Sequence, residues 1–100
     1  MNLNSFKSSL ELNKPPDTLS PYLISLWYDA KGNWEQAHQI IQEIEDRNAS
    51  WIHAYLHRKE GDHSNANYWY HRAGKKMPEC SLSEEWEGIV SLLINPSSAT

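Results

Sequence analysis

Apolar side chains recur at every third or fourth position through most of the chain, which is the spacing typical of amphipathic helices. The alternation of β-branched residues that predicts strands is absent. We therefore expect an all-α protein with a short first helix, within residues 1–14, and five further helices. The positions that define these helices are Leu3, Phe6 and Leu10; Leu23, Ile24, Leu26, Trp27 and Tyr28; Trp34, Ala37, Ile40, Ile41 and Ile44; Ala49, Ile52 and Leu56; Ala66, Trp69, Tyr70 and Ala73; and Trp86, Ile89, Val90 and Leu93.

Start and stop signals set the limits of these helices. Gly61 can adopt the left-handed conformation that closes a helix, and Asp62 can accept hydrogen bonds from the free N–H groups of the next one. Ser81 and Glu84 have the spacing of a capping box, in which each side chain bonds the backbone N–H of the other. The expected helices cover 49–60, 62 to about 75 and 82–94, and the earlier ones start at Asn4 or Ser5, at Ser20 with Pro21, and at Asn33.

The two central pairs of helices repeat one pattern around a glycine. Gly32, Trp34, Ala37, Ile41 and Ile44 in the first pair match Gly61, His63, Ala66, Tyr70 and Ala73 in the second. This arrangement resembles the tetratricopeptide repeat, in which a small residue sits where two helices cross closely and an aromatic residue fills the gap beside it. The spacing from Gly32 to Gly61 is shorter than the ~34-residue period of that repeat, so the resemblance is to a shortened form.

The resemblance implies an architecture for the whole chain. It implies two stacked antiparallel hairpins, with a short N-terminal helix and a C-terminal helix that covers the apolar face of the last pair. We expect one domain over 1–96 and a disordered tail over 97–100. Nearly the whole chain also looks like a group of small uncharacterised proteins with a WIHAYLHRKEGD…NAxYWYxRAGK core. That likeness assigns no activity and no site residue.

Composition excludes several classes of function. The 100 residues carry a net charge of −4, and the one basic cluster, Arg72, Lys75 and Lys76, lies at a helix end, so a nucleic-acid partner is not expected. No apolar run approaches the ~18 residues of a membrane span, and no signal-peptide pattern is present. The single cysteine, Cys80, cannot form an internal disulfide. A cytoplasmic location follows as the simplest expectation.

Aromatic and charged residues gather on one face of the 49–60 helix, where Trp51, Tyr55 and Arg58 align. In tetratricopeptide proteins the first helix of each pair lines a concave groove. That resemblance places Trp51, Tyr55, Arg58 and Lys59 in the groove, together with Tyr22, Leu26 and Asp29 from the first pair. We expect a non-enzymatic module that uses this groove to bind a protein or peptide, without a cofactor. A second copy of the chain is one candidate partner.

A second hypothesis concerns metal binding. His53 and His57 are four residues apart, so both side chains point to the same side of a helix and can share one divalent transition metal. A third ligand is required, and the candidates are His38, His71 and Glu60. The competing interpretation is that His53 and His57 are hydrogen-bonded residues of the core, because His53 lies on the same stripe as Ile52 and Leu56. A nucleophilic enzyme is not favoured, since no strand-turn-helix nucleophile motif is present.

Overall fold

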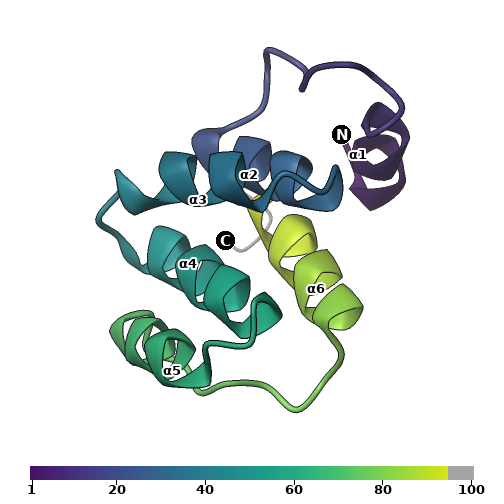
Figure 1. Cartoon of the computed structure of the whole chain (residues 1–100). Helices are drawn as coiled ribbons and strands as arrows, with labels where there is room; N and C mark the ends of the chain where they lie inside the picture. Colours follow the sequence, from purple (N-terminus) through teal and green to yellow (C-terminus); the bar gives the residue numbers. More distant parts are fainter. Residues whose placement is uncertain (95–100) are drawn as a thin grey trace.

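Six α-helices and no strand make up the part of the chain that the computed structural model describes, residues 1–94 (Figure 1). The all-α prediction is therefore confirmed. The helices are α1 (Leu3–Ser9), α2 (Pro21–Ala30), α3 (Trp34–Gln42), α4 (Arg47–Lys59), α5 (His63–Arg72) and α6 (Leu82–Ile94). The expected tail over 97–100 lies outside the described residues.

The helices pair as two hairpins, α2 with α3 and α4 with α5, and both hairpins use the same tight turn. Gly32 and Gly61 have φ angles of 84° and 89°, a conformation that side chains with a Cβ rarely adopt. The next residues, Asn33 and Asp62, cap α3 and α5 by accepting hydrogen bonds from the backbone N–H three positions on. The glycine-centred repeat in the sequence thus corresponds to a repeated turn.

Helix starts follow the predicted caps, with differences at the N-terminal ends of α1 and α4. Ser20 caps α2, and Ser81 and Glu84 form both bonds of the capping box at the start of α6. The expected caps of α1 were wrong, because Asn2 accepts the N–H of the third residue that follows it. Asp46 caps α4, which therefore begins at Arg47, two residues before the expected start.

Small residues lie where the helices of each hairpin cross. Ala37 of α3 and Ala66 of α5 have no exposed surface. The hydroxyl of Ser25 on α2 donates to the carbonyl oxygen of Ala37 at 2.8 Å, and Ala66 packs with Ala54 and Tyr70 between α4 and α5. The small side chains of Ser25 and Ala37, and of Ala54 and Ala66, let the two helices of each hairpin approach closely.

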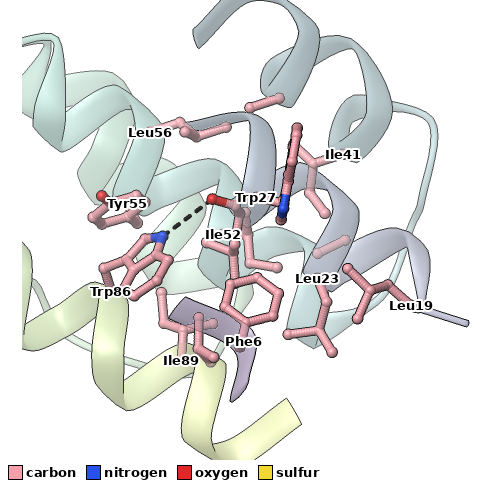
Figure 2. Close-up of a cluster of buried hydrophobic side chains, with 14 residues drawn as sticks. Phe6, Leu19, Leu23, Trp27, Ile41, Ile52, Tyr55, Leu56, Trp86 and Ile89 are labelled. Carbon is pink, nitrogen blue, oxygen red and sulfur yellow. Dashed lines mark hydrogen bonds between the residues drawn. The ribbon is translucent and has the colours of Figure 1, made fainter. Parts of the chain in front are cut away.

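Helix α6 packs against both α2 and α4 and completes the main core. Its buried residues Trp86, Ile89 and Val90 face the hairpins, and the indole N–H of Trp86 donates to the carbonyl oxygen of Leu26 at 3.2 Å (Figure 2). Helix α1 docks beside α6 through the fully buried Phe6, whose ring centroid lies 5.7 Å from that of Trp86. The first helices of the two hairpins, α2 and α4, are thereby covered by α6, with α1 docked beside it.

The lengths and compositions of the helices also bear on membranes. Within residues 1–94, no helix combines the length and the apolar character needed to cross a bilayer.

Candidate functional site

The groove expected between α2 and α4 is largely occupied by the chain's own helix α6. Glu85 of α6 is buried and accepts hydrogen bonds from the indole N–H of Trp51 at 3.1 Å, from Arg58 at 2.8 Å and from the hydroxyl of Tyr70 at 2.6 Å. Arg58 also donates to the carbonyl oxygen of Cys80. The polar atoms of Trp51 and Arg58 are therefore satisfied inside the molecule.

A second buried carboxylate organises the other end of the same face. Asp29 of α2 accepts the hydroxyl of Tyr55 at 2.8 Å and the ammonium group of Lys59 at 2.9 Å. Burial and the neighbouring Asp29 raise the pKa of Tyr55, so its hydroxyl stays protonated and donates. Tyr22 lies apart from both clusters, where its hydroxyl bonds Asp46 at the start of α4.

One part of the predicted groove remains open. A hollow of about 430 Å³ lies where the start of α6 and helix α1 meet the C-terminal ends of α2 and α4. It brings together three of the predicted groove residues, Asp29, Tyr55 and Lys59. Four others do not line it: Trp51, Arg58, Tyr22 and Leu26, of which Leu26 is fully buried in the core. The remaining lining comes from Lys7, Leu10, Ala30, Leu82, Ser83, Trp86 and Glu87. Leu10 and Trp86 belong to stripes that the sequence assigns to the core, so no local signal marks them as lining residues.

Trp51 borders a different hollow, of about 440 Å³, on the other side of α6. The ammonium nitrogen of Lys75 lies 4.1 Å from the centroid of the Trp51 ring, within cation–π range. Trp51 and Tyr55 thus line separate depressions, although they lie four residues apart on one helix.

Three histidines meet where α3 packs on α4. His38 of α3 and His53 and His57 of α4 each place a ring nitrogen within 4.8 Å of the others. The Nε2 atoms of His38 and His53 lie 3.0 Å apart. Of the three candidates for a third ligand, His38 therefore joins the predicted pair directly, whereas His71 is exposed on α5.

Two tryptophan rings stack on two of these histidines. The indole of Trp34 stacks on His38 at a centroid distance of 4.8 Å, and that of Trp69 stacks on His53 at 3.9 Å. Burial, with the neighbouring rings of His38 and His57, lowers the pKa of His53 to about 3. Burial also lowers the pKa of His38. Both rings are neutral near pH 7, which is the form that binds metals.

Glu60 extends the cluster toward solvent. Its carboxylate lies 2.6 Å from Nδ1 of His57, and about a third of the side chain is exposed. His57, Glu60 and Asp62 also form a second group with ligand atoms within 4.8 Å of one another, although both carboxylates are on the surface. Glu60 is one of the three candidates for a third ligand. Its carboxylate contacts Nδ1 of His57, on the opposite edge of that ring from the Nε2 atom.

Comparison of the chain with protein-family models, with curated proteins and with solved structures finds no match. Function is therefore inferred from the side chains themselves.

Proposed function

We propose that the chain is a non-enzymatic protein-interaction module, of the shortened tetratricopeptide kind, that binds a protein segment in the hollow beside α6. The observation that carries the proposal is the hollow itself, which retains Asp29, Tyr55 and Lys59 from the expected groove. Its volume of about 430 Å³ falls within the range of small binding sites. We place this module in the cytoplasm as part of the same proposal.

The lining indicates the chemistry of the partner. Leu10, Leu82 and Trp86 supply an apolar floor, which suits one or two large apolar side chains of a bound segment. Asp29 is only 1% exposed, while its partner Lys59 is 38% exposed, so the accessible charge of that pair is positive. On the opposite edge of the hollow, Lys7 and Glu87 form an ion pair and are equally exposed, so neither charge dominates there. A segment with an apolar anchor followed by a carboxylate complements this arrangement.

Selection from a displayed peptide library on the immobilised protein tests the proposal. We expect enriched peptides that pair a Leu, Phe or Trp with a nearby Asp or Glu. Leu82→Ser should weaken the binding of a selected peptide about tenfold, since the loss of one apolar contact of this size is worth ~1 to 2 kcal/mol.

Leu92→Ser is the matched control, because Leu92 lies on the same helix, is 47% exposed and does not line the hollow. Lys59→Gln should reduce the preference for acidic peptides, with circular dichroism of the variant to establish that loss of the Asp29 partner leaves the fold intact. Equal losses in Leu82→Ser and Leu92→Ser, or enrichment without an apolar anchor, would contradict the proposal. A peptide that binds only to the face of α5 would do the same.

A further inference from the structure

The histidine cluster between the two hairpins is independent of the hollow and lies on the opposite side of α4 from Asp29 and Glu85. We propose that His38, His53 and His57 form a binding site for one divalent transition metal, with Zn²⁺ the best match. The three rings come from two helices that belong to different hairpins. A bound ion would therefore connect the first hairpin to the second.

The donor atoms lie near the arrangement that such an ion requires. A tetrahedral ion with bonds of 2.0–2.1 Å needs ligand nitrogens ~3.3 Å apart. The Nε2 atoms of His38 and His53 are 3.0 Å apart, and all three donors lie within 4.8 Å of one another. His53 and His57 are one helical turn apart and their rings are stacked at a centroid distance of 4.9 Å. Small rotations of the rings therefore bring the three nitrogens around one ion.

The hydrogen bonds of the cluster are compatible with metal binding. In the ion-free protein only one of His38 and His53 can donate in their Nε2···Nε2 contact, so the pair must take different tautomers, and the donor must move its proton to Nδ1 when both Nε2 atoms bind an ion. The Glu60 carboxylate holds the proton of His57 on Nδ1, which leaves Nε2 as the unprotonated nitrogen. A carboxylate behind a ligating imidazole is the usual second partner at zinc sites.

The chemistry of the donors identifies the class of ion. Three uncharged imidazoles suit Zn²⁺, Cu²⁺, Ni²⁺ and Co²⁺, whereas Ca²⁺ and Mg²⁺ require oxygen ligands. Three protein ligands fill three positions of a tetrahedral site and leave the fourth for water. His38 is the most accessible of the three rings, because His53 and His57 are each 7% exposed.

Calorimetric titration of untagged, chelator-treated protein with ZnCl₂, together with the visible spectrum of the Co²⁺-loaded protein, tests the site. We expect one equivalent of Zn²⁺ to bind and Co²⁺ to give the intense absorption of a tetrahedral complex. His38→Gln should weaken Zn²⁺ binding at least 100-fold. Glu60→Gln should weaken it 10- to 100-fold, as expected for the loss of a carboxylate behind a ligand.

His71→Gln is the matched control, since His71 is exposed on α5 and belongs to no group of potential ligands in residues 1–94. It should bind Zn²⁺ as the unchanged protein does. Absence of saturable binding to the unchanged protein would overturn the site whatever the variants do. Equal weakening in His38→Gln and His71→Gln, or an octahedral Co²⁺ spectrum, would also overturn it. Circular dichroism of each variant establishes that a lost site is not a lost fold.

Discussion

At the scale of single residues, two buried carboxylates determine how the helices are held together. Glu85 accepts hydrogen bonds from Trp51, Arg58 and Tyr70, and Asp29 accepts them from Tyr55 and Lys59. In residues 1–94, no buried side-chain nitrogen or oxygen lacks a hydrogen-bond partner. Each carboxylate is thus compensated for its loss of hydration, and removal of a partner should be costly.

The ion pair between Arg58 and Glu85 gives the first prediction. The Arg58 side chain is 14% exposed and that of Glu85 is 2% exposed, so the pair is largely removed from water. Arg58→Ala should lower the free energy of unfolding by about 3 kcal/mol, the lower end of the range for breaking a buried pair, because Tyr70 and Trp51 still bond Glu85. Urea unfolding measures the change. The exposed Arg72→Ala should change it by less than ~0.5 kcal/mol, and a similarly small effect at Arg58 would be inconsistent with the pair.

The buried histidines give a second prediction, for metal-free protein. The pKa of His53 is about 3 in the folded state, below the ~6.5 of an unfolded histidine, and that of His38 is also lowered. As pH falls below about 6.5, the unfolded chain binds protons that folded His53 does not, so stability decreases. The titratable groups facing His53 are His38, His57 and, through His57, Glu60.

Urea unfolding at pH 7 and pH 5.5 with a chelator present checks this sign. We expect lower stability at pH 5.5, and a smaller difference in His53→Gln. Equal or greater stability of the unchanged protein at pH 5.5 would show that His53 is not buried as a neutral ring.

At the scale of helices, the limits follow from local signals. Gly32, Gly61, Asn33, Asp62 and the Ser81–Glu84 box act on the backbone within a few residues, which is why the pattern alone could locate the turns and the start of α6. The N-terminal end of α4 was placed too late because Asp46 was not recognised as a cap. Its side chain accepts the N–H of Ala49, the residue with which the helix was expected to start.

The crossing of α4 and α5 gives a third prediction. Ala66 has no exposed surface and packs against Ala54 and Tyr70. Ala66→Leu should overpack the crossing and destabilise the protein by ~1 to 3 kcal/mol, measured as a lower melting temperature. Asn67→Leu is the control, because Asn67 is exposed on the same helix and should have little effect. Equal melting temperatures for the two variants would mean that the helices do not cross closely at Ala66.

At the scale of the whole molecule, contacts between distant segments decide which surfaces are open. Helical spacing alone places Trp51, Tyr55 and Arg58 on one side of α4. Helix α6, which covers Trp51 and Arg58, begins more than twenty residues later. Figure 1 shows α6 beside both α2 and α4. No local pattern specifies where α6 docks. For the same reason the sequence leaves three candidates for a third ligand, and only the packing of α3 on α4 shows that His38 lies next to His53 and His57.

The arrangement of helices separates the two proposed sites on the two sides of α4. The hollow beside α6 lies next to Tyr55 and Lys59, and the histidine cluster faces α3. Because they share one helix but no residue, a change at one site can be used as a control for the other.

The most direct test of the interaction module is a map of backbone amide shifts in ¹⁵N-labelled protein titrated with a library-selected peptide. We expect the largest shifts around the hollow, at Leu10, Tyr55, Lys59, Leu82 and Trp86, with little change on α5. Shifts concentrated on α5, or on the exposed side of α3, would contradict a binding site in the groove and would place the partner on another surface.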